Sequence, residues 1–128
     1  MAEYGQLHYL PGMLSDYDFS SAQYTLAKVT SGVSNHVGLL ASKTDTRGAG
    51  LVTNVPKSGQ HAAVAWLGLA KINVHSAVYA GQQFTASASG GAIPAGSGDV
   101  IYGTVLANAS PGELTSCMLF AVGARAIA

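Results

Sequence analysis

The residues whose side chains could do chemistry are few in this sequence and widely separated. The single cysteine, Cys117, is surrounded by apolar neighbours, where a buried and inert thiol is the ordinary state. No two histidines have the spacing of a metal site, such as two His four residues apart on a helix. We therefore expect no nucleophilic thiol and no metal site. The histidines are His8, His36, His61 and His75.

The acidic residues and the glycine-rich segments give no catalytic pattern either. Asp16 and Asp18 are the only closely spaced acids, and they lie in an irregular segment where they are expected to cap a turn. Neither a nucleophile-elbow serine motif nor a phosphate-binding loop is present. The run 91–98 is rich in glycine, but Pro94 and the lack of a following helix argue against dinucleotide binding. The sequence predicts a non-enzymatic protein with no cofactor.

The pattern of apolar residues predicts an all-β fold, either a small compact β-barrel or a sandwich. Short runs rich in Val, Ile, Thr and Tyr alternate with Gly, and no 12-residue window keeps a helical apolar stripe. A short helical turn is considered at 21–28, and 86–98 is interpreted as a hairpin tip or loop. In 69–75 we expect Leu69 to share the inner face with Ile72 and Val74. The expected strands are 24–30, 33–41, 49–55, 69–75, 100–107 and 115–122.

Three short segments share a turn pattern, in which a small residue or Pro is followed by Gly and then by Gln or Glu. They are 58–60, 80–82 and 111–113. Each precedes a run that has the character of a strand. Glycine there supplies the positive φ that a tight turn needs. The spacing between them is unequal, which indicates recurring turn chemistry and not a solenoid repeat.

Residues 1–23 differ from the remaining β domain, 24–128, and are interpreted as an extended N-terminal arm. The arm is rich in aromatic residues that follow no period of 2 or 3.6 residues. Large rings are costly to expose, so they must pack on something. Two alternatives remain: contact with another molecule or another subunit, or packing back on the chain's own core. The candidate contact residues are Tyr4, Tyr9, Tyr17 and Phe19.

Charge and hydropathy exclude several classes of protein. The 128 residues contain six basic and six acidic side chains, and charged residues make up 9% where about 25% is usual. Without a basic excess we expect no nucleic-acid partner and no anionic membrane partner. A protein with so few charges tends to associate, so we expect a homo-oligomer or an assembly. With no signal peptide evident, synthesis in the cytoplasm is expected.

Six runs of small residues, Val and Gly recur between residues 58 and 114: 58–60, 63–65, 68–72, 77–87, 101–106 and 109–114. Through these runs the stretch 59–119 resembles the head decoration proteins of tailed bacteriophages, also called capsid cement proteins. This resemblance implies a compact β domain on the outer surface of the virion capsid, made in the host cytoplasm. It further implies binding at junctions between major capsid proteins, as a trimer, with no catalytic residues.

A second hypothesis is a ligand- or receptor-binding β module, such as a carbohydrate-binding domain of a phage surface or fibre protein. Such a module presents exposed Trp or Tyr rings as a binding platform. Trp66 is the only tryptophan, and it lies in an apolar run, so we expect it in the core. Another virion part, such as a minor capsid or tail-tube element, and a small enzyme are the remaining alternatives.

Overall fold

The computed structural model describes the backbone of residues 7–125 and the side chains of residues 7–120. Within this range the chain forms ten strands and no helix. The described residues therefore contain no helix long and apolar enough to cross a membrane. The all-β fold expected from the sequence is therefore confirmed. The strands are β1 (His8–Leu10), β2 (Leu14–Ser15), β3 (Thr25–Val29), β4 (His36–Leu39), β5 (Gly48–Val52), β6 (Val64–Asn73), β7 (Gln83–Ala86), β8 (Ala92–Pro94), β9 (Val100–Val105) and β10 (Leu114–Arg125).

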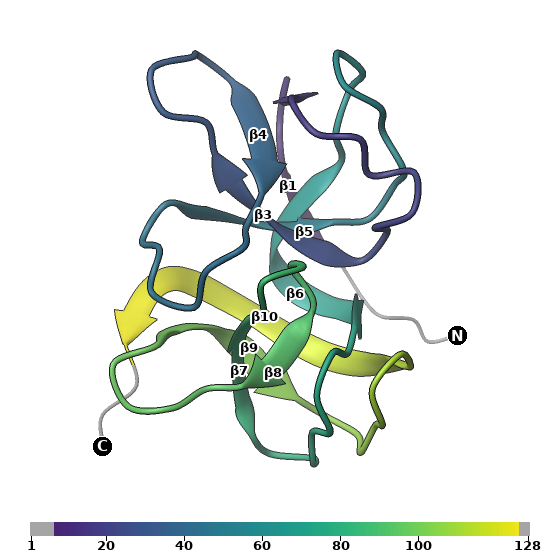
Figure 1. Cartoon of the computed structure of the whole chain (residues 1–128), viewed down its shortest axis with the longest axis vertical. Coiled ribbons are helices and arrows are strands. Elements are labelled where there is room, and N and C mark those ends of the chain that lie inside the picture. The colour runs from purple at the N-terminus through teal and green to yellow at the C-terminus, as the bar shows by residue number, and fades with distance from the viewer. Residues whose placement is uncertain (1–6, 126–128) are drawn as a thin grey trace.

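The strands form one continuous path with open edges, in the order β2-β4-β3-β5-β6-β10-β9-β7-β8, and β1 pairs separately with β6. Figure 1 shows two groups of strands, β1–β5 above and β7–β10 below, with β6 running between them. The first part of β6 pairs with β5 and β1, and Gly68–Asn73 pairs with β10. The change of partner falls at Gly68, whose φ is 120°. Residues with a side chain rarely adopt this backbone conformation, so the position favours glycine.

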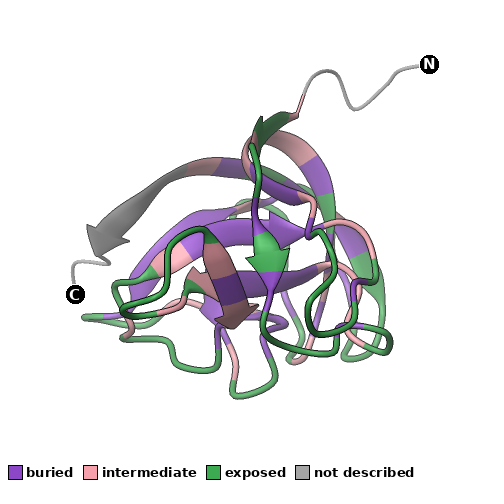
Figure 2. Ribbon diagram, turned by 90° about the horizontal axis from the view of Figure 1, so that it is seen from above, coloured by how far each residue is buried: buried purple, intermediate pink, exposed green. Residues whose placement is uncertain are grey.

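Two apolar cores fill the molecule. The larger core contains Phe84, Ile72 and Val100, all fully buried, and it also includes Leu26 of β3 and Leu51 of β5. The smaller core contains Phe19 and Val37. Figure 2 shows the buried residues concentrated along the strands and the exposed residues along the connecting loops. The two cores meet at β6, since Val64 belongs to the smaller and Ala65 to the larger.

Two local expectations are wrong, and a third is confirmed in part. The segment 86–98 does contain a hairpin tip, at 87–91, but its residues 92–94 form β8, which pairs with β7. The segment 21–28 forms no helical turn, because β3 starts at Thr25 and pairs with both β4 and β5. Leu69 does not share a face with Ile72 and Val74. It is half-buried on the opposite face, in register with exposed Met118, because side chains alternate along a strand.

The recurring turn chemistry is confirmed, with a reciprocal hydrogen-bond pattern. In 57–60, 79–82 and 110–113 the last residue donates its N–H to the first carbonyl, over 2.9, 3.0 and 3.1 Å. The side-chain oxygen of that last residue accepts the N–H of the first, over 2.8, 2.9 and 2.7 Å. The central glycines have φ of +87°, +93° and +90°. Residues 96–99 repeat the pattern with Asp99 as the last residue, an instance not predicted from the sequence.

The extended N-terminal arm is not confirmed. Residues 1–6 lie outside the described residues, and residues 7–23 lie against the β domain. β1 pairs with β6 and β2 pairs in parallel with β4. Met13 and Phe19 are buried in the smaller core, and the Phe19 N–H donates to the carbonyl of Pro56 over 2.7 Å. From residue 7 onward this segment therefore completes the fold.

Candidate functional site

The structure separates the four residues expected to make contacts outside the chain. Phe19 is fully buried and unavailable to any partner, so this expectation is wrong for Phe19. Tyr9 and Tyr17 are 46% and 40% exposed, and their contact with another chain stays a prediction. Tyr17 packs its ring edge-on against Phe19, at a centroid distance of 4.9 Å. Tyr4 lies outside the described residues.

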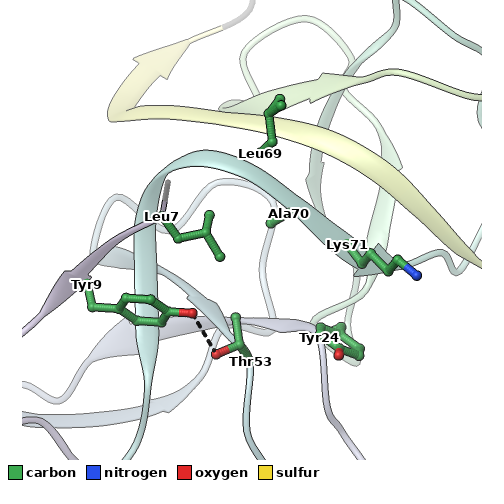
Figure 3. A pocket seen from close by; sticks show the side chains of 7 residues that line it. All are labelled: Leu7, Tyr9, Tyr24, Thr53, Leu69, Ala70 and Lys71. Carbon is green, nitrogen blue, oxygen red and sulfur yellow. Dashed lines mark hydrogen bonds between the residues drawn. The ribbon is translucent and has the colours of Figure 1, made fainter. Parts of the chain in front are cut away.

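Tyr9 lines a pocket at the place where the two groups of strands meet. The pocket encloses about 280 Å³ and is open to solvent. Figure 3 shows Leu7 pointing into the space between the rings of Tyr9 and Tyr24, with β6 behind them. The walls come from β1 and the residue before it, from the residues before β3 and after β5, and from β6. The lining residues are Leu7, Tyr9, Tyr24, Thr53, Leu69, Ala70 and Lys71.

The polar groups of the pocket are mainly hydroxyls. The Tyr9 hydroxyl lies 3.4 Å from Oγ1 of Thr53, and that Oγ1 is also 3.4 Å from the carbonyl oxygen of Ala63. Hydroxyl hydrogen bonds in proteins are usually about 2.5–3.0 Å long, so both contacts are weak. These two hydroxyls therefore keep the capacity to bond to another molecule. The carbonyl of Thr53 accepts a stronger bond, of 2.8 Å, from the Gln23 amide.

Tyr24 has an unusual backbone conformation for a residue of its type. Its φ is 63°, in the left-handed region, where bulky residues are strained. Two hydrogen bonds of 2.9 Å hold it there, from its N–H to the carbonyl of Val52 and from the N–H of Asn73 to its own carbonyl. Oδ1 of Asn73 is buried with no hydrogen-bond partner in the described part of the chain. The conformation aims the half-buried Tyr24 ring at the pocket (Figure 3).

The remaining reactive groups are either buried or held by hydrogen bonds within the fold. Burial raises the pKa of Cys117 to about 12, which keeps the thiol protonated and inert near neutral pH. Nδ1 of His36 lies 2.6 Å from Oδ1 of Asp16, and Thr30 donates its hydroxyl to Oδ2 of the same carboxylate over 2.7 Å. These hydrogen bonds hold the pKa of Asp16 below its usual value. They connect the β2 end to β3 and β4.

The other histidines and the tryptophan are also accounted for. Nδ1 of His75 lies 2.7 Å from Oγ of Ser87, and this contact links the end of β6 to the β7–β8 hairpin. The His8 ring packs against Trp66 at a centroid distance of 5.8 Å, and Trp66 is half-buried. His61 is exposed, and its backbone forms an isolated antiparallel β-bridge with Leu14. Among residues 7–120, no three His, Cys, Asp or Glu side chains come together in a way that could hold a metal ion.

A second surface of interest lies on the loops 76–82 and 106–113. Tyr79 is 59% exposed, and Leu106 and Leu114, at the two ends of the second loop, are 43% and 48% exposed. Each loop contains one of the reciprocally bonded turns, and the Ala80 N–H donates to Oδ1 of Asn108 over 2.9 Å. The only charged residue of the two loops is Glu113, whose carboxylate closes its own turn. This loop end is therefore held by hydrogen bonds, exposes three large apolar side chains and is nearly uncharged.

Comparison with known proteins gives a match for the structure but none for the sequence. No known protein family matches the sequence, and no curated protein matches it. The fold is that of a protein from a bacteriophage head. The structure is similar to the head fiber gp8.5 N base of bacteriophage phi29, with a TM-score of 0.68 and 14% sequence identity. The match covers 89% of this chain and 95% of the other. The expected resemblance to phage head proteins is thus confirmed for the fold.

Proposed function

We propose that this protein is a non-enzymatic structural component of a phage virion. It binds the outer surface of the expanded capsid, at junctions between major capsid proteins, and stabilises the particle. The observation that carries this proposal is the fold shared with the phi29 head fiber base over nearly the whole of both chains. The low charge and the absence of a catalytic pattern in the sequence agree with it.

The proposed stabilisation follows from mass action. A protein that binds only the expanded shell lowers the free energy of that shell by RT ln(1 + [L]/Kd) for each occupied site. At a free concentration of 100 times Kd this is about 2.7 kcal/mol per site. A shell offers many equivalent sites, so the total rises with the number of bound copies. No chemical step is needed.

The loop end is the surface that we assign to the shell. Tyr79, Leu106 and Leu114 expose apolar area on two loops whose turns are already closed, so little conformational entropy is lost on binding. Exposed Tyr and Leu side chains beside few charges are typical of the centre of a protein interface. Three copies grouped as a homotrimer would touch several coat subunits at once and dissociate slowly.

A co-sedimentation assay tests this proposal. The purified protein is mixed with expanded, undecorated capsids of its own phage and, separately, with free coat protein. We expect it to pellet with the capsids and to leave the free coat protein unbound. Attachment should survive molar NaCl and weaken in urea, because apolar burial is insensitive to salt and urea solvates apolar and peptide groups. Release by about half-molar salt would instead show that electrostatic attraction holds it.

The surface assignment has its own control. The double variant Tyr79→Ala, Leu106→Ala should lose attachment at least tenfold while remaining folded, since both side chains are exposed. The matched control is Val33→Ala, which removes a side chain of similar exposure (45%) from the loop before β4. Unchanged attachment of the double variant would refute the assignment to the loop end. Failure of the wild type to pellet with capsids would refute the function itself.

A further inference from the structure

The geometry points to a saccharide-binding site in the pocket between Tyr9 and Tyr24. We propose that it takes a single neutral pyranose ring, either free or at the end of a glycan. The proposal goes beyond shell binding and does not depend on it, because the pocket and the loop end share no residue. Its evidence is the size of the pocket, the chemistry of its walls and the conformation of Tyr24.

The volume and shape of the pocket limit the ligand to a small one. Pockets for drug-sized molecules enclose about 300–1,000 Å³, so 280 Å³ corresponds to one small ring. Because the pocket opens to solvent, a sugar that is part of a longer glycan can enter while the rest of the glycan stays outside.

The lining chemistry matches the two kinds of surface that a pyranose presents. The ring carbons of a sugar form an apolar face, which packs on aromatic rings such as Tyr9 and Tyr24. Its hydroxyl groups both donate and accept, and the hydroxyls of Tyr9 and Thr53 make only the weak contacts of 3.4 Å. Leu7 and Leu69 supply further apolar wall. No carboxylate lines the pocket, so a cationic ligand is not favoured.

The backbone of Tyr24 supports a role for its side chain. Among the described residues, the other positions with a left-handed backbone carry Gly or Asn, the residues that adopt it at least cost. A tyrosine at φ of 63° is the exception, and it lines the pocket. If the position served only to turn the chain, glycine would serve better. We infer that the ring is kept for what it contacts, at the expense of local strain.

The variant Tyr24→Gly separates these two possibilities. Glycine accepts the left-handed backbone without strain, so the midpoint of thermal unfolding should stay within about 5 °C of the wild type. Sugar binding should nevertheless be lost. A fall of the midpoint by more than about 10 °C would show that the ring is needed for packing, and that result would overturn the argument from strain.

Binding is measured on the purified full chain by titration with sugars, followed by amide NMR shifts. The probes are methyl β-glucopyranoside, methyl β-galactopyranoside and N-acetylglucosamine, with glycerol as the negative control. We expect at least one sugar to shift the amides of residues around Thr53 and Ala70, with a dissociation constant of about 1 mM, the range of a small ligand at one open site. No shift with any of the three sugars at roughly 50 times that concentration would overturn the proposal.

Matched substitutions then place the site. Tyr9→Ala should weaken binding about tenfold, and Tyr9→Phe should weaken it less, because the ring remains and only the hydroxyl is lost. The control is Tyr79→Ala, which removes an exposed tyrosine that does not line the pocket. Equal weakening by Tyr79→Ala and Tyr9→Ala would show that the sugar binds exposed tyrosines without a site. Since no capsid is present, these outcomes are independent of the co-sedimentation result.

Discussion

Replacing Phe19 by alanine decides whether the aromatic N-terminal segment is an arm or part of the core. Phe19 is fully buried in the smaller core, and its side chain packs with Met13, Val37 and Val52 in the same cluster. Truncating a fully buried Phe costs about 3–5 kcal/mol, because both the transfer free energy and the cavity count. For a chain of this length, about 4 °C of midpoint corresponds to 1 kcal/mol. Phe19→Ala should therefore lower the unfolding midpoint by roughly 12–20 °C.

The comparison variant is Tyr17→Ala, two residues earlier on the same segment. Tyr17 is 40% exposed and loses mainly its edge-on contact with Phe19, worth about 0.5–1.5 kcal/mol. Thermal unfolding followed by circular dichroism measures both variants, and Phe19→Leu should recover more than half of the loss because it refills most of the cavity. A shift below about 4 °C for Phe19→Ala would refute the reasoning, since a ring on a free arm contributes almost nothing to stability.

Four further predictions follow from particular contacts. Gly50→Ala should prevent folding or lower stability by more than about 4 kcal/mol, because the new Cβ would overlap the backbone carbonyl oxygen of Ala65. Gly59→Ala, with open space around it, should cost only about 1 kcal/mol for its positive φ, and urea titration compares the two variants. Gln82→Ala should cost about 1 kcal/mol by opening one reciprocal turn, measured in the same titration. Cys117 should not react with a disulfide reagent at pH 8 until the protein is unfolded, since burial raises its pKa to about 12; rapid reaction of the native protein would contradict its burial. Hydrogen bonds from Arg47 hold the pKa of Asp45 below its usual 3.8, so the ionised carboxylate stabilises the fold above that pH, and this stabilisation is lost as the pH falls through the lowered pKa. The unfolding midpoint of the wild type should therefore exceed that of Asp45→Asn at pH 7, and the difference should shrink on acidification.

Several features of this protein could be predicted from its sequence because their causes are local. The all-β class follows from short Val- and Thr-rich runs between glycines, with no helical apolar stripe. The turns at 57–60, 79–82 and 110–113 follow from a glycine with positive φ and an adjacent side chain that can reach back to the chain. The inert state of Cys117 follows from its apolar neighbours. None of these depends on which strands lie side by side.

The tertiary structure alone decided where the aromatic side chains of the N-terminal segment lie. Tyr17 and Phe19 are two residues apart in an irregular segment, yet one is 40% exposed and the other fully buried. No periodicity distinguishes them, because the segment packs on strands that are distant in sequence, and the Phe19 N–H finds its acceptor at Pro56. The pocket has the same origin: Tyr9, Tyr24, Thr53 and Lys71 come together only because β6 pairs with β1 and β5. Contacts between residues so far apart depend on strand register, and a one-residue change of register would reverse which side chains face the core.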